Sequence, residues 1–187
     1  MRKYLFPIVA FGSLVMMIVM FKTSATLKTS STPLGILNLE FAYNSAKADT
    51  ILNAWQPDGK IDNIEVAKFN TLLDFIFLFF YSLFLYKACK MLSGSYKGVL
   101  QKTGLLLANG AILAGVLDIL ENAGMLFTLQ GNIYNSILLL TTFVSIIKWI
   151  LALAAVTYLL ILGVAYLIRM KKNNDTTQWL KWTQPLK

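Results

Sequence analysis

Apolar residues gather in four long runs, separated by shorter and more polar connections. The runs cover residues 4–21, 72–86, 104–129 and 137–168. With flanking helix included, each reaches the lower limit of about 17 residues for a membrane-spanning helix. The pattern predicts an all-α membrane protein in which residues 1–187 form a single domain. Its fold is a four-transmembrane-helix bundle with spans at about 4–21, 62–92, 103–128 and 137–169, followed by a tail at 170–187.

The connection between the first and second spans, about residues 22–61, is long enough to form structure of its own, and we call it the cap. Ser45 is predicted to cap the start of a short helix, which Pro57 and the turn at 58–59 end. Helical spacing gives that helix one apolar face, made of Ala48, Ile51, Leu52 and Trp55. Residues 37–43 alternate with a strand period, but a lone strand has no partner. The conformation of 34–44 therefore stays open.

The second span is predicted to begin outside the membrane. Asp62 with Glu65 three positions later is typical of a capping box, and Ile61 with Val66 completes a hydrophobic staple. We therefore expect a small amphipathic cap that leads into the second helix and lies over the extracytoplasmic end of the bundle.

The composition agrees with a membrane protein and narrows its chemistry. Of 187 residues, 57% are hydrophobic and 14% charged, and the mean hydropathy is +0.62. Histidine is absent and Cys89 is the single cysteine, which excludes disulfides and histidine-dependent catalysis. We expect no cofactor and no metal site. Residues 54–65 match part of a calcium-binding loop, but Ala54 stands where the first oxygen ligand belongs.

Basic residues are distributed unevenly among the connections. They are concentrated before the first span, between the second and third spans, and after the fourth, at Arg2, Lys3, Lys87, Lys90, Lys97, Lys102, Arg169, Lys171, Lys172, Lys181 and Lys187. The positive-inside rule then predicts that both termini are cytoplasmic, in a bacterial inner membrane. The net charge of +8 favours attraction to anionic membrane lipid and no nucleic acid.

The first apolar run also resembles a signal peptide with a cleavage site at 23–25. It is longer than the usual apolar core of about 7–15 residues, so an uncleaved anchor is expected, with a removed signal as the alternative.

Four ionisable residues interrupt the spans: Asp74, Asp118, Glu121 and Lys148. A rise of 1.5 Å per residue places Asp118 about 21 Å and Glu121 about 25 Å from the cytoplasmic boundary of a ~30 Å apolar layer. Lys148 lies about 31 Å from that boundary, and Asp74 lies near the outer start of its helix. All four therefore converge in the outer third of the bundle.

Polar side chains share a helical face with these charges. Helical spacing aligns Asn122 with Asp118 and Glu121, Ser145 with Lys148, and Tyr81 with Asp74. The face of the third span continues through the small residues Ala111, Ala114 and Gly115, which permit close helix contact. We expect a single site, here called the polar cluster, made of Asp74, Tyr81, Asp118, Glu121, Asn122, Ser145 and Lys148.

Short motifs resemble a family of uncharacterised bacterial four-span membrane proteins. Residues 39–42 (LEFA) resemble its Leu-Glu-Leu-Ala type opening, 51–55 (ILNAW) its Ile-Leu-x-x-Trp segment, and 117–122 (LDILEN) its Leu-Asp-x-x-Glu-Asn signature. The likeness covers residues 37–125 and implies a shared fold with these residues at its centre. It points to Glu40 and Trp55 as functional residues of the cap, and it implies no activity.

Several functions fit these observations. The buried charges can simply neutralise one another and fix helix register. Three carboxylates against one lysine leave an imbalance, however, and a protonatable acid in a pocket is typical of functional sites. A non-catalytic protein that binds a lipid, a lipophilic small molecule, a partner membrane subunit or a second copy of itself ranks first. An intramembrane enzyme with Asp118 or Glu121 as acid or base is the alternative. A proton-coupled transport element ranks last, because four spans without a repeat are few for a transporter.

Overall fold

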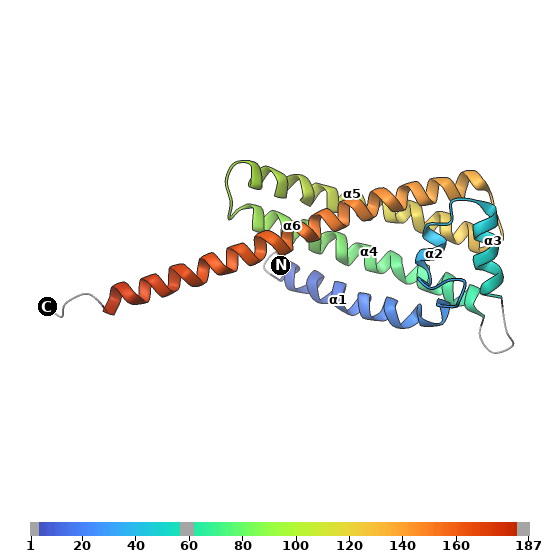
Figure 1. Ribbon diagram of the computed structural model, residues 1–187, viewed down its shortest axis with the longest axis horizontal. Coiled ribbons are helices and arrows are strands. Elements are labelled where there is room, and N and C mark those ends of the chain that lie inside the picture. Colours follow the sequence, from blue (N-terminus) through green and yellow to red (C-terminus); the bar gives the residue numbers. More distant parts are fainter. Residues whose placement is uncertain (1–3, 57–61, 183–187) are drawn as a thin grey trace.

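The computed structural model of the protein (Figure 1) describes residues 4–56 and 62–182, with side chains described to residue 171. Within the described residues, all regular elements are helices and no strand occurs. The elements are α1 (Leu5–Thr23), η1 (Ala25–Leu27), α2 (Leu37–Glu40), α3 (Ser45–Ala54), α4 (Asn63–Ser93), α5 (Val99–Leu129) and α6 (Asn135–Trp182). The helices α1, α4, α5 and α6 are long and apolar enough to cross a membrane. The predicted all-α, four-helix membrane bundle is therefore confirmed.

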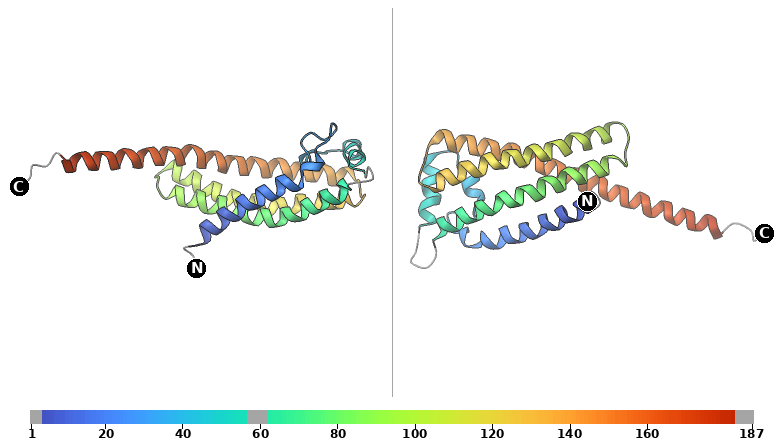
Figure 2. Two further views of the ribbon diagram at one scale, coloured as in Figure 1. Left: turned by 90° about the horizontal axis from the view of Figure 1, so that it is seen from below. Right: turned by 180° about the vertical axis from the view of Figure 1, so that it is seen from behind.

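The four long helices pack around the hairpin of α4 and α5. The helix α1 lies against α4, and α6 lies against α5 and partly against α4 (Figures 1 and 2). The helices η1, α2 and α3 cover one end of the bundle, which we call the cap end. The chain begins at the opposite end, where α6 continues beyond the other helices as a long projecting rod. The helix α6 thus continues to Trp182, within the segment predicted as a tail.

Small residues let α5 approach both of its neighbours, as the sequence predicts. Ala111 and Ala114 are fully buried. A Cβ atom added to Gly115 would lie 2.8 Å from the Cβ of Ser82 on α4, so only glycine allows this approach. Gly124 is in the same position against Thr141 of α6. These contacts fix how the polar face of α5 meets α4 and α6.

A small apolar core holds the cap together. The Trp55 side chain is fully buried, and its indole Nε1 donates to the backbone oxygen of Leu27 at 3.0 Å and to Thr32 Oγ1 at 3.2 Å. The predicted apolar face of α3 packs in this core. Residues 37–40, whose conformation the sequence left open, form the short helix α2. The cap is thus a folded unit seated on the bundle.

The starts of α3 and α4 test two predicted helix caps. The prediction that Ser45 caps α3 is wrong, because Asn44 does so and its side-chain oxygen accepts from the Lys47 backbone N–H. Asp62 caps α4 as predicted, accepting from the N–H groups of Ile64 and Glu65. The Glu65 carboxylate does not complete a capping box but pairs with Lys68 at 2.6 Å.

Ile61, Pro57 and the turn predicted at 58–59 lie outside the described residues. Two of the observed helices differ clearly from the predicted spans. The helix α5 begins four residues earlier than expected, at Val99 rather than at residue 103, and α6 ends at Trp182 rather than at residue 169.

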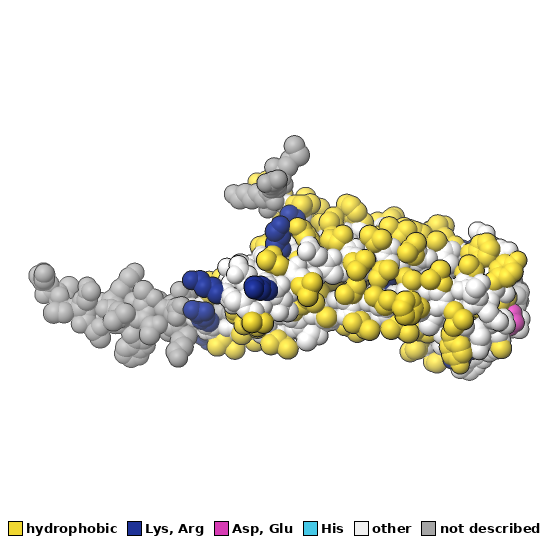
Figure 3. All heavy atoms as spheres, turned by 90° about the horizontal axis from the view of Figure 1, so that it is seen from above, with side chains coloured by type: hydrophobic (Ala, Val, Ile, Leu, Met, Phe, Trp, Pro, Cys, Tyr) yellow, Lys and Arg dark blue, Asp and Glu magenta, His cyan; other side chains and the backbone are white. Residues whose placement is uncertain are grey.

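The surface of the bundle is apolar along the four long helices, as Figure 3 shows for one face. Phe11 on α1 is 69% exposed and Ile161 on α6 is 64% exposed, which suits contact with lipid chains rather than water. Figure 3 also shows lysine and arginine side chains gathered near the end opposite the cap. The protein is therefore an integral multi-pass membrane protein.

Candidate functional site

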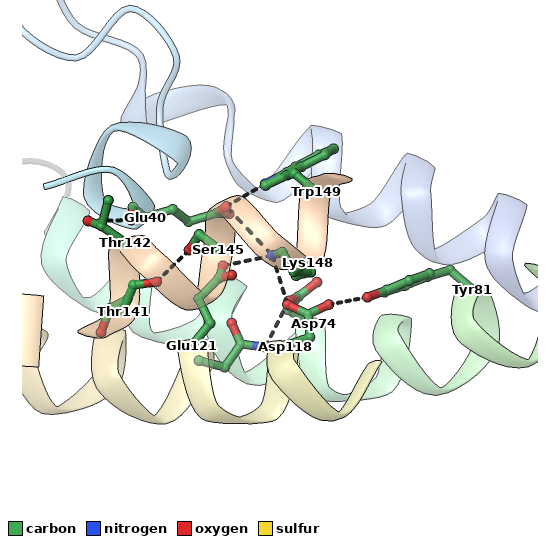
Figure 4. A network of polar contacts seen from close by, with 11 residues as sticks. Glu40, Asp74, Tyr81, Asp118, Glu121, Thr141, Thr142, Ser145, Lys148 and Trp149 are labelled. Carbon is green, nitrogen blue, oxygen red and sulfur yellow. Dashed lines mark hydrogen bonds and ion pairs between the residues drawn. The ribbon is translucent and has the colours of Figure 1, made fainter. Parts of the chain in front are cut away.

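Lys148 is the centre of the polar side chains beneath the cap (Figure 4). Its ammonium group lies on α6 and donates to Glu121 Oε1 at 2.7 Å and to Asp118 Oδ1 at 2.9 Å, both on α5. Asp118 is 2% exposed and Glu121 is fully buried. These contacts bring together three of the predicted site residues, Asp118, Glu121 and Lys148, from the third and fourth spans.

A third carboxylate reaches Lys148 from the cap. Glu40, the last residue of α2, places its Oε2 atom 3.6 Å from the lysine ammonium. The Trp149 indole N–H donates to the same oxygen at 3.0 Å, and the Thr142 hydroxyl donates to the Glu40 backbone oxygen at 3.2 Å. Sequence reasoning selected Glu40 as a cap residue but did not place it beside Lys148, and it missed Trp149. We call this group, including Tyr81, the Lys148 network: Glu40, Tyr81, Asp118, Glu121, Lys148 and Trp149.

The helix α4 contributes two half-buried side chains, Asp74 and Tyr81. The Tyr81 hydroxyl donates to Asp118 Oδ2 at 2.8 Å and so joins the Lys148 network. Asp74 accepts from the side-chain amide of Asn122 at 2.8 Å. Within the described residues, no hydrogen bond joins this Asp74–Asn122 pair to the network, and the two groups are linked through consecutive residues of α5, Glu121 and Asn122.

Two predicted site residues do not join these contacts. Ser145 is fully buried on the expected face, but its hydroxyl donates to the backbone oxygen of Thr141 at 2.9 Å. This intrahelical bond satisfies the hydroxyl one turn away from Lys148. Trp55 is in the core of the cap, where it holds the segment that precedes α2. Its contribution to the site is therefore indirect.

Acceptors outnumber donors at the site. Four carboxylates, on Glu40, Asp74, Asp118 and Glu121, surround Lys148 or adjoin its network, and five hydrogen bonds reach them. Glu121 Oε2 and Asn122 Oδ1 are buried and have no hydrogen-bond partner. A buried polar atom without a partner costs about 1–3 kcal/mol. The site is thus short of hydrogen-bond donors and of positive charge.

The arrangement limits the chemistry that the site supports. Among the described residues, no group of three or more acidic or cysteine side chains is placed to hold a metal ion, since Lys148 occupies the point where three of the carboxylates meet. The two unpartnered acceptors of the site, Glu121 Oε2 and Asn122 Oδ1, have the capacity to accept hydrogen bonds from a donor that reaches them. The chain of contacts from Tyr81 through Asp118 to Lys148 also offers a path for a proton.

Comparison with known proteins gives no family, since no protein-family model, curated protein or solved structure matches the chain. The resemblance carried by residues 39–42, 51–55 and 117–122 therefore stays a prediction.

Proposed function

We propose that this chain is a non-catalytic multi-pass membrane protein that binds the polar head of an amphiphile at the site beneath its cap. The observation that carries the proposal is the partial exposure of Asp74 and Tyr81. Lys148, Asp118 and Glu121 are enclosed. On α4, Tyr81 extends the Lys148 network toward the surface of the bundle, and Asp74 does the same for its separate pair with Asn122. A head group can therefore reach the site while its chain stays among the apolar helices.

The energetics of buried charge support this proposal over a purely structural role. A buried ion pair is often no more stabilising than a well-packed apolar pair, because taking both charges out of water is costly. Two carboxylates would suffice to neutralise and orient Lys148, and a third is already supplied by the cap. Asp74 adds a further acid that pairs only with a neutral amide. Intramembrane acids of this kind are typical of ligand and ion sites.

An intramembrane enzyme is the second candidate, and a specific observation favours it. The Tyr81 hydroxyl is half-buried and donates to Asp118, whose other oxygen accepts from Lys148. A carboxylate held between a tyrosine and an ammonium group is suited to acid–base chemistry on a lipophilic substrate. Asp118 and Glu121 would then be the acid and base. A proton-coupled element would use the same chain of contacts and ranks third.

We also propose that the cap end faces away from the cytoplasm, in a bacterial inner membrane. The described lysine and arginine side chains at the opposite end, which include Lys97, Lys102 and Arg169, form no ion pair within the described residues. Positive charge of this kind is retained on the cytoplasmic side. Alkaline phosphatase should be inactive when fused to the C-terminus and active when inserted at residue 57. The reverse pattern would contradict the orientation.

Native mass spectrometry of the purified protein tests the proposed function. We expect the wild-type protein, released from a mild non-ionic detergent, to retain an amphiphile that lipid extraction then identifies. Asp74→Asn should reduce its occupancy, whereas Glu65→Gln, which alters an exposed ion pair with Lys68, should not. Chemical conversion of the retained amphiphile by the wild-type protein would favour the enzyme. Equal occupancy in the wild type and in Asp74→Asn would contradict binding at this site.

A further inference from the structure

We propose that the ligand of this site is an amphiphile whose head group carries a primary ammonium, and this inference rests on the proposed function. The head group would donate N–H bonds to Asp74 and to the buried acceptors Glu121 Oε2 and Asn122 Oδ1, which have no partner. The class of ligand follows from what the site lacks, namely hydrogen-bond donors and positive charge.

The four acids of the site can accept more hydrogen bonds than the protein donates to them. Each carboxylate oxygen accepts about two hydrogen bonds, so the four acids of the site have far more capacity than the five donors that reach them. Lys148 uses two of its three N–H groups on Asp118 and Glu121, and its third is directed no closer than 3.6 Å to Glu40. Neither hydrogen bond of Lys148 reaches Glu121 Oε2, which has no partner in the structure.

The contact between Asn122 and Asp74 places an unpartnered acceptor near the surface of α4. Asn122 Nδ2 donates to Asp74 Oδ2 at 2.8 Å, so the Asn122 side-chain oxygen, on the same amide group, also lies close to Asp74. Asn122 is fully buried and Asp74 is half-buried. The pair therefore connects the enclosed acceptors of α5 with the surface of α4. An ammonium group that arrives beside Asp74 therefore lies near the unpartnered Asn122 oxygen, and Asn122 directly follows Glu121 along α5.

Charge also selects an ammonium over a neutral or acidic head group. A phosphate or carboxylate head would approach four carboxylates and one lysine, and like charges repel strongly where water is excluded. A hydroxyl group supplies one donor and no charge, whereas a primary ammonium supplies three donors and a positive charge. A quaternary ammonium supplies the charge without donors. These differences make the donor requirement testable with matched amphiphiles.

The test compares three amphiphiles with the same twelve-carbon chain: dodecylamine, dodecyltrimethylammonium and dodecanoate. Each is titrated into the purified full-length protein in dodecyl maltoside at pH 7.5, and the thermal unfolding midpoint is recorded. A ligand that binds only the folded state raises this midpoint in proportion to the logarithm of its concentration. We expect the midpoint to rise with the logarithm of the dodecylamine concentration. The Kd derived from this rise should be at least about tenfold lower than the Kd for dodecyltrimethylammonium, a difference of about 1.4 kcal/mol. Dodecanoate should not raise the midpoint.

Single substitutions test whether dodecylamine binds at Asp74 and Glu121. Asp74→Asn removes a charge without changing size and should weaken dodecylamine binding about tenfold or more, since a hydrogen bond to a charged group is lost. Glu121→Gln should also weaken it, and the exposed Glu65→Gln should behave as the wild type. Circular dichroism and gel filtration verify that each variant is folded, and Asp74→Asn, the less buried change, serves if Glu121→Gln does not fold.

The outcomes separate this inference from the proposed function. Saturable binding of dodecanoate or dodecyltrimethylammonium with the affinity of dodecylamine, weakened by Asp74→Asn, would overturn the ammonium inference and leave an amphiphile site in place. An unchanged midpoint with all three amphiphiles, together with no retained amphiphile in native mass spectra, would overturn both. Dodecylamine binding that is equal in the wild type and Asp74→Asn would reflect general insertion into micelles and would also overturn the inference.

Discussion

Removal of the Lys148 ammonium is the perturbation whose result the structure defines most sharply. Lys148→Met keeps an unbranched apolar side chain but leaves Asp118 and Glu121 without the donor that holds each of them at 2.9 and 2.7 Å. Removing one partner of a buried ion pair costs about 3–5 kcal/mol, because the other charge remains buried. We therefore expect a loss of unfolding free energy in that range, with Glu40 also losing its ion-pair partner at 3.6 Å.

Neutralising the abandoned acids should recover this stability stepwise. Adding Asp118→Asn removes one of the two carboxylates that accept hydrogen bonds from Lys148, so the double variant should recover about half of the loss, or ~2 kcal/mol. Adding Glu121→Gln should recover most of the remainder, since Glu40 keeps its hydrogen bond from Trp149.

The assay is reversible unfolding in mixed micelles of a non-ionic detergent and sodium dodecyl sulfate, followed by circular dichroism. Lys68→Met is the matched control, because it breaks an exposed ion pair with Glu65 and should cost about 0–1 kcal/mol. Independent residues give additive changes within about 0.5 kcal/mol. If the losses of unfolding free energy caused by Lys148→Met and Asp118→Asn simply add in the double variant, the proposed coupling between these two residues is refuted.

Three further changes probe the helix start, the helix packing and the cap. Asp62→Ala should lower the unfolding free energy by about 1 kcal/mol, a typical loss for a helix cap, measured in the same micelles. Gly115→Ala should cost about 1–3 kcal/mol, since the added Cβ meets Ser82. Gly163→Ala, with nothing within 4 Å of the added Cβ, should instead stabilise the helix by up to about 1 kcal/mol. Glu40→Gln should speed limited proteolysis within the cap relative to the wild type, because the ion pair with Lys148 is lost; an unchanged rate would contradict its role in holding α2.

The spans and the depth of their charges could be predicted because both depend on local regularities. Runs of apolar residues define the helices, and a constant rise per residue places Asp118, Glu121 and Lys148 at a common level. Helical spacing then turns them inward, since facing lipid would be costly. The contact of Tyr81 with Asp118 follows from the same registry.

Residues of the cap could not be placed by such regularities. Glu40 meets Lys148 across 108 positions of sequence, and its position depends on how η1, α2 and α3 pack around Trp55. The same difficulty explains the helix start at Asn44: the Ser45 backbone N–H donates to the side-chain oxygen of Asn135, a partner that local spacing does not reveal. Tertiary contacts chose between two adjacent residues with similar capping preference.

The central claim is that the polar side chains beneath the cap bind the head of an amphiphile. An experimentally determined structure of the protein in lipid nanodiscs, prepared without delipidation, tests it most directly. The claim predicts head-group density within hydrogen-bond distance, about 3 Å, of Asp74 or Glu121, continuous with a chain along the apolar surface of the bundle. Two observations together would contradict the claim. Lipid density would be ordered only elsewhere on the bundle, and Glu121 Oε2 would accept a hydrogen bond from the protein or from water.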